Sequence, residues 1–329
     1  MVAATAWVGT TDAVASDDAA DSDVVFGYED RDITESSGLV ARGRMMFTVN
    51  DSGDGPYVYA VDSATGETAG KVTYSGDHVE DVEAVAPGSD DAVWVGDIGD
   101  NNEDRATLDL YRVPMPDPQR DREVDARRFG LVYPDGPHDA EALLGHPRTE
   151  RAYVVSKGIL GGTVYAAPAS LEEAAPNRMV EVGRVPGLVT DGAFFPDGRH
   201  IVLRSYGSAT VYTFPRLRQV GRFALPAQEQ GEAVAVDGKG RVYIGTEGAY
   251  TDVLQIRLPE PVRVALGDQG STQPPPASSA PSAEGADPAS DRTSSEEGDG
   301  IWVAGGVLLV TLAGWLFLTV FRRRGPRRP

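Results

Sequence analysis

A five-fold internal repeat is the feature of this sequence that most restricts its fold. Five segments begin with an acidic residue before a run of small or apolar residues: Glu35, Glu83, Glu141, Asp191 and Glu232. The spacings between them are 48, 58, 50 and 41 residues. Each is followed by further strand-like runs, such as MMFTVN at 45–50 and AVWVGD at 92–97, separated by Gly, Asp, Asn and Pro. Four short strands per repeat of this length are typical of β-propeller blades.

We therefore predict an all-β fold, a β-propeller of five four-stranded blades over residues 23–267. The run VVFGYEDRDI at 24–33 leaves two alternatives open. It either completes the last blade or belongs to a sixth, irregular blade. No long segment of helical period competes with the strands in this region.

The C-terminal 62 residues have a different composition. Residues 268–300 are rich in Pro, Ser and acidic residues, which predicts a disordered stalk. The next 21 residues begin at Ile301, end at Phe321 and carry no charge, which is long enough for one transmembrane helix. The arginine-rich tail at 322–329 is expected on the cytoplasmic side, so the propeller should be extracytoplasmic on a single-pass cell-membrane protein.

Export of the propeller requires a signal, and residues 1–22 resemble the end of one. A short apolar stretch is followed by Ala13, Val14 and Ala15, a small-x-small pattern typical of signal-peptidase sites, and then by an acidic leader. We interpret residues 1–22 as the remnant of a signal peptide plus this leader. The alternative is a cytosolic tail-anchored protein, which would place the arginine cluster outside.

Composition restricts the partners. The formal net charge is −20, and the chain before the arginine-rich tail is more acidic still. Such a surface repels nucleic acid and suits divalent cations, so we expect no nucleic-acid partner. The sequence has no cysteine, which excludes disulfides, thiolate metal sites and cysteine nucleophiles.

The acidic residues that open the repeats are expected at one end of the propeller channel. In a propeller the first strand of each blade lines the channel and the second returns antiparallel to it, so the start of one and the end of the other meet at the same mouth. The acidic residue that opens each repeat is separated by 13 to 16 residues from the polar residue that ends the second strand. This predicts a shared ring of polar residues: Glu35, Asn50, Asp51, Glu83, Asp97, Asp100, Asn101, Glu141, Asp191 and Glu232, with Lys157, Arg204 and Glu247 nearby.

So many carboxylates at one opening repel one another unless they are protonated, paired or bound to a metal. A hard cation with oxygen ligands would relieve this repulsion, and we expect Ca²⁺, which prefers carboxylate, amide and backbone oxygens. A structural alternative remains: each acidic residue caps backbone N–H groups at the start of its blade and does nothing more.

Several of these motifs also occur in a known group of propellers. The runs ESSGL, NDSG and GDIGDN, with DGPHDAEALL, SKG, QGEAVAV and GTEG, resemble the phytase-like and SdiA-regulated-like β-propellers of secreted or membrane-anchored bacterial proteins. There is a more distant likeness to gluconolactonase-type propellers. The resemblance implies a calcium-dependent propeller with its site at the channel mouth, at Glu35, Asn50, Asp51, Glu83, Asp97, Asp100, Glu141 and Glu232.

Two functions follow from this sequence. The first is a binding module, in which calcium organises a surface that recognises an envelope protein or a small anionic ligand. The second is a calcium-dependent hydrolase acting on esters, lactones or phosphoesters. In that case Glu35 or Glu83 would activate water, and Lys157 and Arg204 would stabilise the developing negative charge.

Overall fold

The computed structural model describes residues 14–267, apart from 52–53, 76–78, 89–90 and 117–119. The predictions for residues 1–13, the stalk at 268–300, the membrane helix at 301–321 and the tail at 322–329 lie outside the described residues. Within the described part, no helix is long and apolar enough to cross a membrane.

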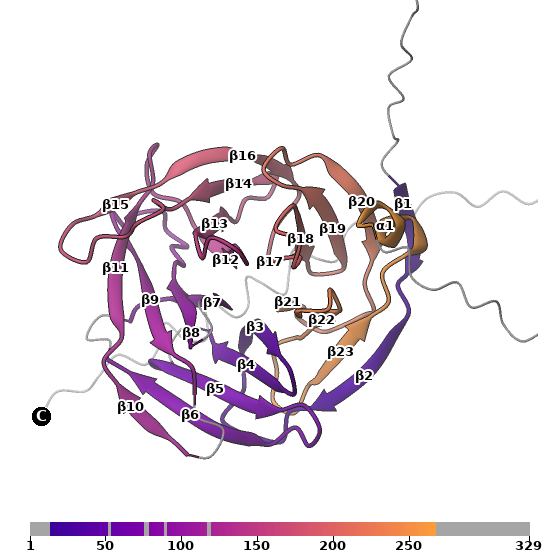
Figure 1. Cartoon of the computed structure of the whole chain (residues 1–329), viewed down its shortest axis with the longest axis horizontal. Coiled ribbons are helices and arrows are strands. Elements are labelled where there is room, and N and C mark those ends of the chain that lie inside the picture. The colour runs from indigo at the N-terminus through magenta and orange to yellow at the C-terminus, as the bar shows by residue number, and fades with distance from the viewer. Residues whose placement is uncertain (1–13, 52–53, 76–78, 89–90, 117–119, 268–329) are drawn as a thin grey trace, which may run out of the picture. The chain divides into compact units, whose positions relative to one another are not determined.

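Five sheets surround a central axis, and each supplies one short strand to the centre (Figure 1). The innermost strands are β3 (Ser36–Arg42), β7 (Val82–Pro87), β12 (Ala140–Gly145), β17 (Asp191–Phe194) and β21 (Val234–Val236). Each packs against the next, and β21 packs against β3, so the ring closes. The structure is therefore an all-β propeller of five blades, which we number 1 to 5 from β3.

Each inner strand continues into an antiparallel meander of three more strands. The second strands are β4 (Met45–Asn50), β8 (Ala92–Asp97), β13 (Ala152–Ser156), β18 (His200–Ser205) and β22 (Val242–Ile244). The third are β5 (Tyr57–Asp62), β9 (Leu108–Pro114), β14 (Gly161–Ala166), β19 (Ser208–Thr213) and β23 (Asp252–Ile256). The fourth are β6 (Thr68–Tyr74), β11 (Arg127–Val132), β16 (Val180–Pro186), β20 (Gln219–Ala224) and, from the N-terminal side, β2 (Ser22–Gly27).

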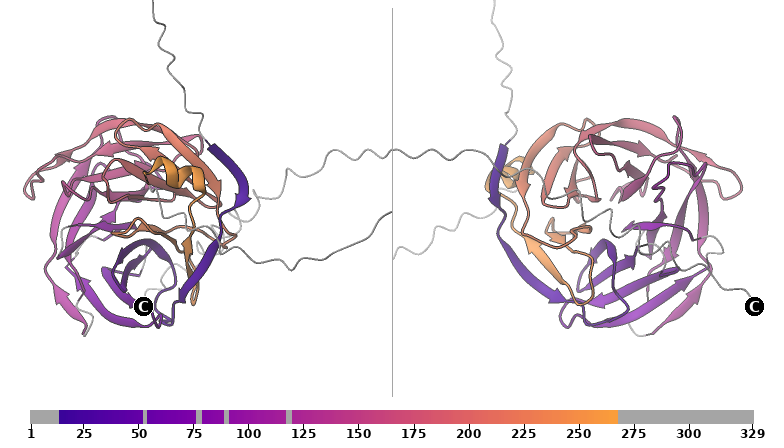
Figure 2. Two further views of the ribbon diagram at one scale, coloured as in Figure 1. Left: turned by 45° about the vertical axis from the view of Figure 1, so that its right-hand side comes forward. Right: turned by 180° about the vertical axis from the view of Figure 1, so that it is seen from behind.

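Strand β2 settles the alternative left open by the sequence. It pairs antiparallel with β23 and so completes blade 5, and there is no sixth blade in the described part of the chain. Figure 2 shows the indigo N-terminal strand running beside the orange C-terminal ones. Phe26 of β2 is buried in the apolar cluster between blades 5 and 1, so this strand joins the two ends of the propeller by hydrogen bonds and by packing.

Three blades carry a fifth strand, added parallel at the outer edge. These strands are β10 (Arg122–Val124) beside β6, β15 (Asn177–Arg178) beside β11, and β1 (Val14–Ala19) beside β20. In each case the fifth strand belongs to the chain segment that goes on to form the outer strand of the next blade. Neighbouring blades are therefore linked at their rims as well as at the centre.

Burial follows the position of each strand in its blade. The inner strand β12 and the second strand β8 are buried along their whole length, which matches their nearly continuous apolar sequences. The outer strand β6 alternates between buried and partly exposed residues. Five apolar clusters fill the five interfaces between adjacent blades. One short helix, α1 (Glu260–Ala265), follows β23 and packs against β20.

Candidate metal centre

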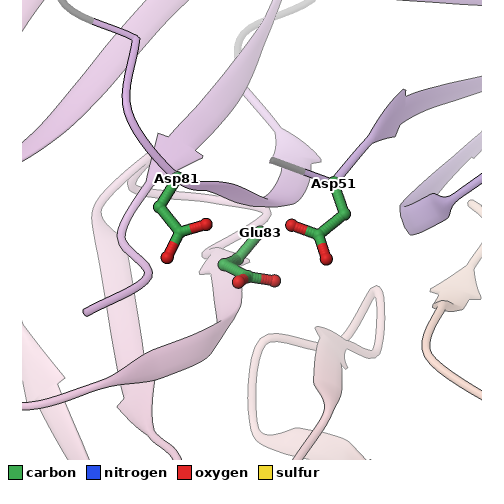
Figure 3. Close-up of side chains that lie close together, drawn as sticks. All are labelled: Asp51, Asp81 and Glu83. Carbon is green, nitrogen blue, oxygen red and sulfur yellow. The ribbon is translucent and has the colours of Figure 1, made fainter. Parts of the chain in front are cut away.

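The candidate site lies where the inner strands begin and the second strands end, an opening that we call the channel mouth. Three carboxylates meet there: Asp51 follows β4, Asp81 precedes β7, and Glu83 lies within β7. One oxygen from each lies within 4.8 Å of the others. Figure 3 shows the three side chains turned toward one space, with Glu83 between Asp81 and Asp51. We call these residues the carboxylate cluster.

A β-bulge positions Glu83. Val82 pairs with Asp97 and Ala84 with Gly96, so Glu83 is the extra residue of the inner strand. Bulges redirect a side chain and are common beside functional sites. The hydroxyl of Ser37, on the neighbouring blade, donates a hydrogen bond of 2.7 Å to the carbonyl of Glu83, which holds the bulge in place.

Glu83 is the least compensated member of the carboxylate cluster. Its side chain is only 7% exposed, and among the described residues its carboxylate has no hydrogen-bond or ion-pair partner. Burial raises the pKa of Glu83 well above its usual value, and the negative charges of Asp51 and Asp81 raise it further. A buried carboxylate in this state is stabilised by a proton or by a cation.

Gly99 makes room for the carboxylate cluster. A Cβ atom at this position would lie 2.5 Å from Cγ of Asp81 and 2.9 Å from Oε1 of Glu83. The backbone N–H of Gly99 also donates to the carbonyl of Asp81, at 3.1 Å. The loop GDIGDN therefore contributes to the site through a residue without a side chain.

The bulge recurs in blade 3 around Glu141, between the pairs Ala140–Ser156 and Ala142–Val155. Glu141 is buried and forms an ion pair with Lys157, while its Oε2 atom has no hydrogen-bond partner among the described residues. In blade 5, Glu232 is also buried, and burial raises its pKa, while the positive charges of Lys157 and Arg204 lower it. Lys157 thus compensates the charges of Glu141 and Glu232 in part, and its charge also lowers the pKa of Glu83.

The carboxylates around the opening extend beyond the cluster. Burial raises the pKa of Glu247, which follows β22, to about 8, and the charges of Glu232 and Asp51 contribute. Glu35 is exposed at the rim, and burial and Asp51 raise its pKa. The residues that we call the mouth carboxylates are Glu35, Asp51, Asp81, Glu83, Asp139, Glu141, Glu232 and Glu247.

The polar residues at the ends of the second strands form hydrogen bonds with backbone N–H groups and do not join the carboxylate cluster. Asp97 is fully buried, accepts the N–H groups of Glu80 and Asp81 at 2.9 and 3.0 Å, and pairs with Arg105 at 2.9 Å. In blade 1, the side-chain oxygen of Asn50 accepts the N–H groups of the two residues before β3, at 3.1 and 3.2 Å.

Asp100 has a similar local role. Its two oxygens accept the N–H groups of Asp104 and Arg105 at 3.0 and 2.8 Å, which folds the acidic loop after β8. Asn101, next to it, is exposed. Asp97, Asn50 and Asp100 thus carry the backbone contacts that the structural alternative described, whereas Glu83 has no such contact.

Asp191 and Arg204 lie deeper, at the junction of blades 4 and 5. Asp191 on β17 lies opposite Arg204 on β18 in the strand register. The carboxylate of Asp191 accepts the N–H of Val234 at 2.6 Å. Arg204 is fully buried and donates to the carbonyls of Ala233 and Gly245, both at 2.6 Å. Burial lowers the pKa of Arg204 to about 10. This guanidinium joins two blades.

Sequence counting did not identify Asp81 and Asp139, although a signal was present. Strand pairing aligns ESSGL in blade 1 with DVEAV, DAEAL, TDGAF and QGEAV in blades 2 to 5. The bulge position is then occupied by Ser37, Glu83, Glu141, Gly192 and Glu232. Glu35 corresponds to Asp81 and Asp139, two positions earlier. Glu35 and Glu83 are equivalent openers in the sequence comparison but are offset by two positions in the strand pairing, so that comparison passes over Asp81.

Fold and site together define a five-bladed β-propeller with an acidic, asymmetric channel mouth. The chain matches no protein-family model and no curated protein in sequence.

Proposed function

We propose that the channel mouth binds calcium and that the protein is a binding module whose recognition surface this ion organises. The observation that carries the proposal is the carboxylate cluster, with Glu83 at its centre. Glu83 is buried, and its carboxylate has no hydrogen bond or ion pair with another described residue. Two charged carboxylates 4.8 Å apart repel by about 3 kcal/mol at an effective dielectric constant of about 20. A divalent cation turns this repulsion into attraction.

The chemistry of the donors favours calcium over other common ions. Asp51, Asp81 and Glu83 offer only oxygen, the donor that Ca²⁺ and Mg²⁺ prefer, and no histidine or cysteine belongs to the cluster. Ca²⁺ accepts six to eight oxygens in irregular geometry, whereas Mg²⁺ needs a near-ideal octahedron. The other mouth carboxylates and the backbone carbonyls around the opening could supply further ligands, which suits the more tolerant ion.

We further propose that the protein is attached to the cell membrane through residues 301–321, with the propeller outside. Extracellular calcium sites work at about 10⁻⁴ to 10⁻³ M, so a site of few ligands is adequate there. Leu266 and Gly267 lie beside the hairpin loops at 195–197 and 238–242, at the channel end opposite the mouth.

Calcium binding is tested by isothermal titration of the metal-free protein. The wild type should bind calcium with an affinity in the range of extracellular sites, and an Asp81→Asn variant should bind at least about tenfold more weakly. Glu67→Gln is the matched control, because Glu67 is exposed in the turn between β5 and β6 at the opposite end of the blade. Equal calcium affinities of the Asp81→Asn variant and the wild type would refute the site.

Membrane attachment is tested separately by fractionation. The full chain should remain in the membrane pellet after an alkaline wash, and a chain that ends at residue 300 should not. Protease added to intact cells should digest the propeller. If the propeller stays protected while the chain is membrane-bound, the proposed orientation is incorrect.

A further inference from the structure

Large apolar side chains are exposed on one part of the channel mouth. Ile159 and Leu160, between β13 and β14, are 88% and 95% exposed. Tyr206, between β18 and β19, is 44% exposed, and Tyr250, between β22 and β23, is 60% exposed. All four lie in loops that join the second strand to the third, on the consecutive blades 3, 4 and 5. We call them the apolar rim.

The local structure holds these side chains outward. Ile159 and Leu160 lie between Gly158 and Gly161, whose backbones form a hydrogen bond of 3.2 Å. A Cβ atom on Gly158 would overlap the carbonyl oxygen of Gly161, and one on Gly161 would lie 2.5 Å from the carbonyl oxygen of Val185. This tight turn therefore depends on two glycines, and the side chains between them point to solvent.

Tyr250 is also an exposed side chain on a constrained backbone. Its φ angle is +60°, a left-handed conformation that bulky residues rarely adopt. Strained backbone is retained where the surrounding structure enforces it, and it is often found at binding sites. The exposed side chain of Tyr250 is available for contact with a partner.

The apolar rim lies beside the acidic floor of the mouth. The backbone carbonyl of Tyr206 lies 2.9 Å from the position of a Cβ atom on Gly231, the residue before Glu232. Burial raises the pKa of Tyr206 to about 12, and the negative charges of Glu232, Glu247 and Glu83 contribute. Lys157 directly precedes the turn of blade 3 and pairs with Glu141. One bound calcium ion and Lys157 supply three positive charges against eight carboxylates. Even with Glu247, whose pKa is about 8, largely protonated at neutral pH, the floor stays acidic.

We propose that the apolar rim and the mouth carboxylates form a docking surface for a polypeptide segment that carries Lys or Arg next to large apolar side chains. The inference rests on the proposed function, because it assigns a partner class to the same mouth. Charge complementarity selects a basic partner over nucleic acid or anionic lipid headgroups. Side chains exposed on projecting turns suit a protein surface, with aromatic and aliphatic anchors as its centre.

Peptide selection tests this surface. A displayed library of random peptides is panned in calcium against the wild type and against an Ile159→Ser, Leu160→Ser variant. Peptides enriched on the wild type should combine Lys or Arg with Leu, Ile or aromatic residues. A synthetic peptide of enriched sequence should bind the variant at least about tenfold more weakly.

The matched control removes apolar side chains exposed elsewhere. A Val24→Ser, Val264→Ser variant changes two exposed residues on β2 and α1 and should bind the same peptide within about twofold of the wild type. Tyr206→Ser, on a different blade, should weaken binding as well and serves if the turn variant does not fold. Absence of enrichment, peptides without apolar residues, or equal affinity for the turn variant would each overturn the proposal.

Calcium titrations of the same proteins separate the two proposals. The Ile159→Ser, Leu160→Ser variant should bind calcium like the wild type, since neither side chain belongs to the carboxylate cluster. Intact calcium binding without peptide binding would refute the docking surface alone. Peptide binding that persists in a chelator, with no calcium binding, would refute the metal site alone.

Discussion

Replacing Glu83 by Gln should stabilise the metal-free protein and remove most of the stability that calcium adds. Glu83 is buried, and its carboxylate forms no hydrogen bond among the described residues, so the amide loses no partner. In a chelator at pH 8, the variant no longer carries a charge within 4.8 Å of Asp51 and Asp81. Each of these repulsions amounts to about 3 kcal/mol, and protonation and Lys157 already relieve part of it. We expect the metal-free variant to be about 2 kcal/mol more stable than the wild type.

Calcium should cancel this difference or slightly reverse it. A ligand that binds only the native state at one hundred times its dissociation constant adds about 2.7 kcal/mol to the free energy of unfolding. The wild type should gain this amount, whereas Glu83→Gln should gain less than about 1 kcal/mol because a cluster ligand is lost. Urea unfolding of both proteins, in chelator and in saturating calcium, measures all four values.

Glu67→Gln is the control and should match the wild type within about 0.5 kcal/mol in both buffers. A metal-free Glu83→Gln protein that is less stable than the wild type would refute this reasoning. That result would mean that Glu83 holds its blade together, as Asp97 does, and is not a charge that requires a cation.

Three further results are expected. Phe26→Ala should lower the free energy of unfolding by about 3 kcal/mol in urea, because Phe26 is buried where β2 closes the ring, whereas Ala in place of the exposed Val24 should change it by less than about 0.5 kcal/mol. Arg204→Met should cost about 3 to 5 kcal/mol in the same assay, because it leaves buried Asp191 without its neighbouring cation, and a cost below about 1 kcal/mol would contradict that role. In chelator, thermal melts should show stability falling between about pH 4.5 and pH 8, because the pKa of Glu247 is raised to about 8 in the folded state, so the unfolded state releases its proton first; a rise over this range would contradict the pKa shift.

The architecture was predictable because each blade repeats one solution to the same burial problem. Runs such as AVWVGD and AEALLG are buried on both faces, and their nearly continuous apolar sequences predict this burial. The outer strands alternate, as β6 does, because only one face packs on a neighbouring blade. The repeat of these patterns at regular spacing predicted the five blades. The same pattern predicts VRVAL at 262–266 as the fourth strand of blade 5, but this run lies in and after α1, and β2 supplies that strand instead.

The register of the mouth was harder to predict. A β-bulge adds one residue to the inner strand at Glu83 and another at Glu141, while β17 has none, so counts along the sequence do not compare equivalent positions. The parallel strands β10 and β15 also carried no signal, because each is only two or three residues long and is defined by the neighbouring blade. Such features depend on contacts between blades, and periodicity within one segment does not report them.

The five-fold scaffold explains how a symmetric fold carries an asymmetric site. Two sets of positions have different roles at the mouth. Residues at the ends of the second strands, such as Asn50 and Asp97, accept backbone N–H groups, so the residue at the bulge position is free to vary. Thr190 of blade 4 donates to the carbonyl of Glu232 in blade 5, at 3.4 Å, as Ser37 of blade 1 does to Glu83. In the two blades whose bulge position lacks a carboxylate, at Ser37 and Gly192, a hydroxyl therefore forms a hydrogen bond with the glutamate backbone of the next blade. The mouth carboxylates accordingly lie on blades 1, 2, 3 and 5, and the exposed apolar side chains on blades 3, 4 and 5. This uneven distribution makes the mouth asymmetric, so a partner can bind in one preferred orientation.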